Sequence, residues 1–157
     1  MATNYRLGES STRAVRKVRV DELELPERPE YAMPTIPADI TAVDSATLMD
    51  IFVEINSWMD YVDVQLAAAL IDEKYEEQKL EEITAREHLQ AKDEKNVATM
   101  KAVAFENPDF LAQRERVHQA YGYRRITETI YNRLDRGKFV ISREITRRAG
   151  DFRNSAS

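Results

Sequence analysis

The chain has 157 residues, of which 43% are hydrophobic and 32% charged, and its formal net charge is −5. This length fits one domain. The absence of cysteine excludes disulfides, thiolate nucleophiles and cysteine-based metal sites, and it makes a reducing, cytoplasmic compartment the expected location. Four of the five prolines lie within residues 26–37 and only four glycines occur, so little interrupts helices elsewhere. The composition predicts an all-α protein, and no apolar stretch predicts contact with a membrane.

Residues 1–41 predict an extended N-terminal arm, because they show no sustained hydrophobic periodicity. Residues 1–20 hold five basic side chains against one acidic, a charge of +4, and a stretch rich in proline and glutamate follows. Prolines at this density favour irregular or polyproline-like chain. The sequence leaves two interpretations open, an unbound tail or a segment that becomes ordered on a partner.

A long helix is predicted from Asp44 to about Ala91, with Asp44 or Ser45 as its N-cap. Apolar residues in this stretch recur at alternating spacings of four and three, which is the pattern of a coiled-coil seam. We therefore expect a homo-oligomer that associates through this seam, which comprises Leu48, Phe52, Ile55, Met59, Val62 and Leu66 and continues to Ala69. Trp58 widens the apolar stripe and is expected in the core.

The remainder of the chain predicts shorter helices. Asp93 opens one that ends before Asn107, and Asn107 with Pro108 opens another, with proline at its first position. Gly137 is a natural C-cap for that helix. A brief extended run at 139–141, a last helix over 142–148 and a frayed tail at 151–157 would follow. Residues 42–150 are thus expected to form an elongated helical hairpin or small bundle.

No enzyme motif is present. Four isolated glycines cannot form a phosphate-binding loop. Glu115 and His118 have the Glu-x-x-His spacing of di-iron bundles, but those bundles need the motif twice. We therefore predict no catalytic residue, metal or cofactor, and we interpret the acidic run over 73–87 as a solvated or inter-subunit face.

Basic and aromatic side chains interleave near the C-terminus, where residues 111–157 hold eleven basic and five acidic side chains, a charge of +6. Guanidinium groups can contact phosphates while exposed bases stack on rings, which suits single-stranded DNA. The candidate phosphate contacts are Arg124, Arg125, Arg133, Arg136, Lys138, Arg143, Arg147 and Arg148, and the stacking candidates are Tyr123 and Tyr131. Alternatively, Tyr121 and Phe139 belong to the core and the arginines pair with the acidic helix of another subunit; both can hold together.

Two stretches carry a resemblance to a known family. The first is the long helix around INSWM with Trp58, and the second is YGYRRITETIYNRLDRGKFVISREI. Over residues 45–150 the chain resembles the UvsY-like recombination mediators of T-even phages. That resemblance implies a ring-forming helical protein that binds single-stranded DNA and helps to load a RecA-like recombinase, with a single-strand-binding protein as another possible partner. The acidic overall charge and the N-terminal arm depart from the family pattern.

The sequence therefore favours a non-enzymatic, single-stranded DNA-binding recombination mediator of phage origin that acts in the host cytoplasm. The alternative is a phage structural or assembly protein, such as a virion or connector component, whose copies associate through the helices and the arm. A third interpretation is a regulatory adaptor that binds a partner through the arm.

Overall fold

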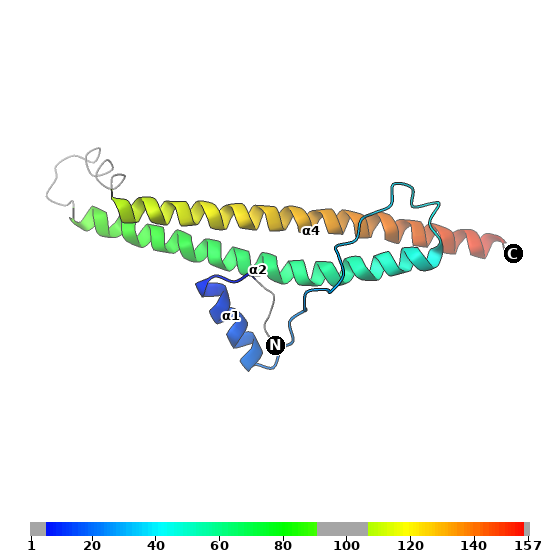
Figure 1. The fold of residues 1–157 in the computed structure, drawn as a ribbon, viewed down its shortest axis with the longest axis horizontal. Helices are drawn as coiled ribbons and strands as arrows, with labels where there is room; N and C mark the ends of the chain where they lie inside the picture. Colours follow the sequence, from blue (N-terminus) through cyan, green and yellow to red (C-terminus); the bar gives the residue numbers. More distant parts are fainter. Residues whose placement is uncertain (1–5, 91–106, 156–157) are drawn as a thin grey trace. The chain divides into compact units, whose positions relative to one another are not determined.

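The computed structural model describes residues 6–90 and 107–155, and this part of the chain holds three helices and no strand. Helix α1 spans Glu9–Val20, α2 spans Ser45–Gln90 and α4 spans Pro108–Ser155 (Figure 1). The all-α prediction is confirmed. The short helix expected from Asp93 lies outside the described residues.

The chain divides into two compact units. The described residues of unit 1 are 24–65 and 127–155, and those of unit 2 are 6–23, 66–90 and 107–126. Within each unit a segment of α2 packs against a segment of α4 that runs in the opposite direction. In unit 2, for example, Glu73 contacts Arg124 whereas the later Glu76 contacts the earlier Gln113. Each unit is thus built on an antiparallel helix pair.

Both long helices begin where the sequence predicts. The carboxylate of Asp44 accepts hydrogen bonds from the amides of Ala46 and Thr47, at 3.0 and 2.9 Å. The side-chain oxygen of Asn107 accepts one from the amide of Asp109 at 2.8 Å. Such caps satisfy amides that have no partner inside the helix. The predicted N-termini of α2 and α4 are confirmed.

The predicted seam forms much of the core of unit 1, but within a single chain. Four of its residues are buried, namely Leu48, Ile55, Met59 and Val62, while Phe52 and Leu66 are half-buried. Leu134 and Ile141 of α4 are buried in the same unit. At these four positions the seam packs within the chain, and the association of copies through the seam stays a prediction. Trp58 is buried as predicted.

Helix α4 does not end at Gly137, which corrects the predicted C-cap, the extended run at 139–141 and the frayed tail up to Ser155. Leu134, Gly137, Ile141 and Glu144 are all buried at spacings of three and four, so one packed face continues through the glycine. Packing along this face outweighs the cost of about 1 kcal/mol for a glycine within a helix. The absent side chain has a use, because a Cβ there would lie 2.7 Å from Cδ1 of Ile36.

Helix α1 corrects the prediction that the whole arm is extended. Its N-terminus is held by Asp72 of α2, whose carboxylate accepts hydrogen bonds from the amides of Gly8 and Ser11 at 2.7 and 2.9 Å. The hydroxyl of Ser11 also donates to Asp72, at 2.6 Å. A helix of 12 residues is marginal alone, so this contact from 61 residues away stabilises it. Sequence periodicity does not reveal such a distant cap.

Residues 24–44, which we call the strap, contain no helix and pack on unit 1. Ile36 contacts the surface at Gly137, Arg28 lies over the ring of Trp58, and Arg148 donates to the carbonyls of Ile40 and Thr41. This part of the arm packs against the chain's own helices, which is neither of the two interpretations that the sequence left open.

Candidate nucleic-acid interface

The ten predicted DNA-binding residues are divided between the units. Tyr123, Arg124 and Arg125 lie in unit 2, and the other seven lie in unit 1. They also differ in their surroundings, because Arg124, Arg147 and Arg148 are bound to carboxylates, whereas Arg133, Arg136 and Arg143 form no ion pair with another described residue. An arginine that is held by a carboxylate has less charge to offer a phosphate.

In unit 2, Arg124 and Tyr123 are engaged in the packing of the unit. Arg124 forms an ion pair and hydrogen bond with the buried carboxylate of Glu73. The ring of Tyr123 is half-buried, and the guanidinium of Arg6 lies 4.5 Å from its centroid. Base stacking on Tyr123 would have to displace Arg6. Arg125 is exposed.

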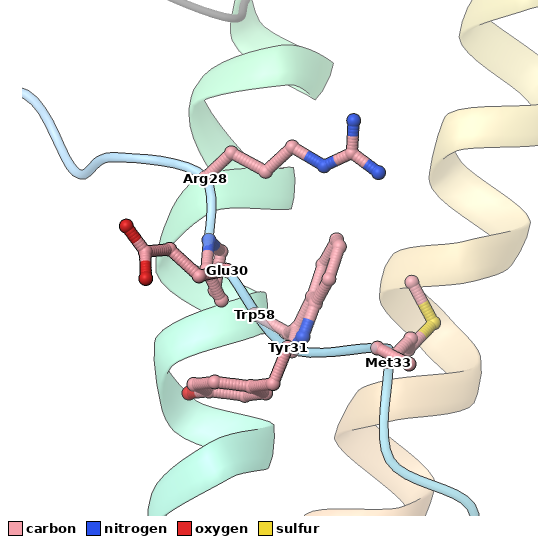
Figure 2. A pocket seen from close by; sticks show the side chains of 7 residues that line it. Arg28, Glu30, Tyr31, Met33 and Trp58 are labelled. Carbon is pink, nitrogen blue, oxygen red and sulfur yellow. The ribbon is translucent and has the colours of Figure 1, made fainter.

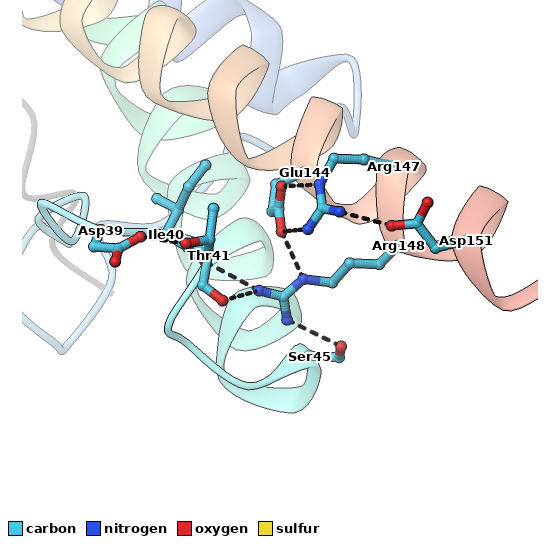
Figure 3. A network of polar contacts seen from close by, with 8 residues as sticks. All are labelled: Asp39, Ile40, Thr41, Ser45, Glu144, Arg147, Arg148 and Asp151. Carbon is cyan, nitrogen blue, oxygen red and sulfur yellow. Dashed lines mark hydrogen bonds and ion pairs between the residues drawn. The ribbon is translucent and has the colours of Figure 1, made fainter.

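In unit 1, Arg147 and Arg148 converge on the buried carboxylate of Glu144 (Figure 3). Arg147 donates to both oxygens of Glu144, at 2.8 and 2.7 Å, and to Asp151 at 2.6 Å. Arg148 donates to Glu144 at 2.7 Å. Hydrogen bonds from the two guanidinium groups lower the pKa of Glu144 to about 2, so the carboxyl is ionised at neutral pH.

Arg148 also joins the end of the strap to α4. Its guanidinium donates to the carbonyl of Ile40 at 3.0 Å, to that of Thr41 at 3.1 Å and to the hydroxyl of Ser45 at 3.2 Å (Figure 3). With the bond to Glu144, this uses every nitrogen of the guanidinium. Arg148 therefore acts in the packing of unit 1, although the sequence made it a candidate phosphate contact.

The basic stripe, as we name Arg133, Arg136 and Arg143, is different. All three residues are exposed, and none forms an ion pair with another residue that the structure describes. Their spacings of three and seven place them on one face of α4. Lys138 and Tyr131 are half-buried and lie on another part of the helix surface. The stripe thus brings three of the predicted phosphate contacts together.

Phe139 and Tyr121 are exposed, which corrects the alternative that they belong to the core. Phe139 is 65% exposed and Tyr121 is 50% exposed. Phe139 borders two shallow depressions in unit 1: one is lined by Asp135, Arg136, Lys138, Phe139, Val140 and Ser142, and the other by Phe139, Ser142, Arg143, Thr146 and Arg147. An aromatic ring therefore lies in the water-facing surface beside the basic stripe. The sequence did not predict this position of Phe139, because it predicted an extended run at 139–141, and only a continuous helix determines which face Phe139 occupies.

A separate pocket lies where the strap crosses α2. It is lined by residues 28–33 and by Trp58, whose indole is only 6% exposed (Figure 2). The guanidinium of Arg28 is 5.8 Å from the centroid of that ring, and Tyr61 meets the indole edge-on at 6.0 Å. The indole nitrogen is buried and has no hydrogen-bond partner among the described residues. Trp58 here anchors the strap, a role that the sequence alone did not suggest.

Glu115 and His118, which have the Glu-x-x-His spacing, both lie in unit 2. Glu115 accepts a hydrogen bond from Gln119 at 3.0 Å, and His118 is exposed. Over residues 6–90 and 107–155 no group of three His, Cys, Asp or Glu side chains is placed to hold an ion. In the same ranges no helix combines the length and the apolarity needed to cross a membrane.

Comparison with known proteins gives no relative from which a function could be transferred. No protein-family model, curated protein or solved structure matches the chain.

Proposed function

We propose that this protein is a non-enzymatic, single-stranded DNA-binding protein whose phosphate contacts lie on the C-terminal part of α4. The observation that carries the proposal is the basic stripe, in which Arg133, Arg136 and Arg143 are exposed on one helix face and have no carboxylate partner among the described residues. Cations in this state can exchange their counterions for phosphates, and the release of counterions drives binding.

The proposal narrows the set of contacts expected from the sequence. Arg124, Arg147 and Arg148 each hold a carboxylate within the chain, so we assign them to packing. The stripe is assigned the phosphate contacts, while the exposed Arg125 and the half-buried Lys138, which lies on another part of the helix surface, stay sequence predictions. The net charge of −5 does not oppose this assignment, because binding depends on the local potential and the negative charge is concentrated in residues 21–110.

A preference for single strands is supported by the aromatic surface beside the stripe. The ring of Phe139 is exposed next to Arg136 and Arg143 in sequence and on the helix surface. Bases in a duplex are stacked on one another, whereas bases in a single strand are free to stack on a protein ring. The resemblance to UvsY-like mediators adds the hypothesis that a RecA-like recombinase or a single-strand-binding protein is a partner.

The experiment is a titration of fluorescently labelled oligonucleotides with the purified chain, read by fluorescence anisotropy at low and near-physiological salt. We expect the single strand to bind more tightly than the duplex of the same sequence. The double variant Arg136→Ala with Arg143→Ala should weaken binding to the single strand by about tenfold or more. No binding of the wild type at low salt would refute the proposal.

A matched control separates specific contacts from a general change in charge. The double variant Arg114→Ala with Arg116→Ala removes the same two positive charges from exposed positions of the same helix, outside the stripe. We expect it to change the affinity by less than about threefold, because distant exposed charges are screened by salt. Equal losses in the two double variants would mean that the stripe has no special role.

A second candidate function, an assembly protein whose copies associate, is favoured by a different observation. Met49 and Val53 are 46% and 57% exposed, and they lie one helical turn apart on α2. They adjoin the buried seam but face outward, so they could meet a second copy without opening unit 1.

Sedimentation velocity tests this second candidate. The wild type would sediment as an oligomer, and the double variant Met49→Gln with Val53→Gln would shift it toward one chain, because the apolar area that drives association is removed. Val20→Gln, at a 74% exposed position of α1, serves as the control. A wild type with the mass of one chain at every concentration would remove this candidate.

A further inference from the structure

The exposed ring of Phe139 has no role in the packing of unit 1. Its side chain is 65% exposed, while the neighbouring Gly137 and Ile141 are buried on the opposite side of the same helix turn. Exposed single apolar residues are common on proteins. The surroundings of this one are less common, because cations flank it along the helix.

The position of Phe139 in the helix fixes these flanking cations. Arg136 is three residues before it and Arg143 four residues after it, so each lies about one turn away on the same side of α4. Of the two depressions at the ring, one is lined by Arg136 and Lys138 together with the acidic Asp135, and the other by Arg143 and Arg147. A flat aromatic surface thus lies between two arginines whose Cα atoms are separated along the axis by about 10 Å.

We propose that Phe139 is the stacking platform for one nucleobase, with the flanking phosphates bound by Arg136 and Arg143. This inference rests on the proposed function. It makes Phe139 the stacking residue in place of Tyr123 and Tyr131, which the sequence predicted. A nucleotide is the occupant that matches the surface, because it combines an aromatic face with anionic groups on both sides. Tyr123, in contrast, already carries the guanidinium of Arg6 on its ring.

Two other occupants fit less well. A lipid surface would require a broad apolar face, but among residues 135–147 the exposed large apolar side chains are only Phe139 and Val140. A second protein copy would have to bring carboxylates to Arg136 and Arg143 as well as cover the ring. Both occupants are outcomes of the test below.

The test is the affinity for single-stranded DNA of four variants of the full chain, measured by anisotropy. Phe139→Ala and Phe139→Leu should each weaken binding by about tenfold, because neither offers a π face, whereas Phe139→Trp should keep the wild-type affinity. Val140→Ala removes apolar area next to the ring and should change the affinity by less than twofold. Since Phe139 is exposed, all four should unfold at the wild-type temperature.

An abasic oligonucleotide of the same length supplies a direct check for stacking. Without bases, the wild type and Phe139→Ala should bind equally, because the ring has nothing to stack on. A loss in Phe139→Ala that persists on the abasic strand would overturn the proposal. So would a Phe139→Leu variant with wild-type affinity, which would indicate a general apolar contact.

Failure of the stacking site and failure of the function can be told apart. The first case is that the wild type binds single strands and that Arg136→Ala with Arg143→Ala weakens this binding, whereas Phe139→Ala does not. The stacking site is then wrong and the proposed function stands. If the wild type binds no single strand, the function falls. Binding of the chain to anionic vesicles that is lost in Phe139→Ala would assign the ring to a lipid surface and overturn the proposal. A Phe139→Ala variant that changes only the sedimentation of the chain would assign the ring to a second copy and also overturn it.

Discussion

The two units use different physical means to hold the same pair of helices. The buried residues of unit 1 are mostly large and apolar, as Leu48, Ile55 and Ile141 illustrate. In unit 2 the large apolar Phe110 and two alanines are joined by the buried polar residues Ser11, Glu73 and Gln113, each with a hydrogen-bond partner on another helix.

Buried carboxylates in both units explain which positive charges of α4 are available. Glu73 engages Arg124 in unit 2, and Glu144 engages Arg147 and Arg148 in unit 1 and leaves the basic stripe on the surface. The number of cations in a stretch is therefore a poor guide to a binding site. The carboxylates within reach of each cation decide what it can bind.

The largest effect is expected from a cavity in the apolar unit. Ile55→Ala removes a side chain that is 1% exposed and should lower the free energy of unfolding by about 3 kcal/mol. The control is Ile126→Ala in unit 2, at a 64% exposed position, which should cost less than about 0.5 kcal/mol. Urea denaturation followed by circular dichroism measures both. Similar losses would contradict the location of the core.

A smaller effect is expected from the polar contacts of unit 2. Glu73→Gln removes the charge that pairs with Arg124 and should destabilise the protein by about 2 kcal/mol, because the carboxylate is buried. Glu77→Gln breaks the exposed contact with Lys74, 2.9 Å long, and should cost about 0.5 kcal/mol or less. The same urea titration measures the loss of stability in both variants. If Glu73→Gln is neutral, the packing of unit 2 does not depend on this pair.

Two of the three glycines within α4, one in each unit, sharpen the comparison at about 1 kcal/mol. Gly122→Ala in unit 2 meets nothing within 4 Å and should stabilise the helix by that amount. Gly137→Ala in unit 1 should gain less, because the new Cβ would lie 2.7 Å from the tip of Ile36. With Ile36→Ala in the background, Gly137→Ala should recover the full gain. Thermal unfolding measures the change in stability for each of the three glycine substitutions. Equal gains at both glycines in the wild-type background would show that Ile36 of the strap does not need the space left by Gly137.

An effect of a different kind, which depends on pH, is expected in unit 1. The pKa of Glu144 falls from the ordinary 4.5 to about 2 in the folded chain, so its contribution to stability is present above pH 4.5 and is lost as the pH falls toward 2. Glu144→Gln should therefore unfold at a lower temperature than the wild type at pH 6, and the gap should close near pH 2. Melting curves across this range measure it. A gap that stays constant would argue against ionised Glu144 as the centre of the network.

Sequence patterns predicted those parts of the fold that local chemistry determines. The caps Asp44 and Asn107 and the alternating apolar spacing of α2 need no information from elsewhere in the chain. Helix α1 could not be predicted in this way, because its N-terminus depends on Asp72. Gly137 misled for the same reason: its role is to admit Ile36 of the strap, and a glycine near a helix end otherwise indicates a stop.

The candidate site was predicted only as a region. The interleaved basic and aromatic residues of the C-terminal stretch indicated a surface for single-stranded DNA, but the sequence could not say which arginines are bound to carboxylates. Glu73 lies 51 residues from Arg124, so that pairing depends on the fold. Glu144 lies three and four residues from Arg147 and Arg148, a spacing that could have identified these two as partners of a carboxylate.

The salt dependence of single-strand binding tests the central claim most directly. The affinity of the wild type and of Arg136→Ala with Arg143→Ala would be measured by anisotropy over a series of salt concentrations. If both arginines contact phosphates, the slope of log K against log salt should become shallower by about 1.4 in the double variant, since each contact on a single strand contributes about 0.7. An unchanged slope would contradict the claim that the basic stripe binds the DNA backbone.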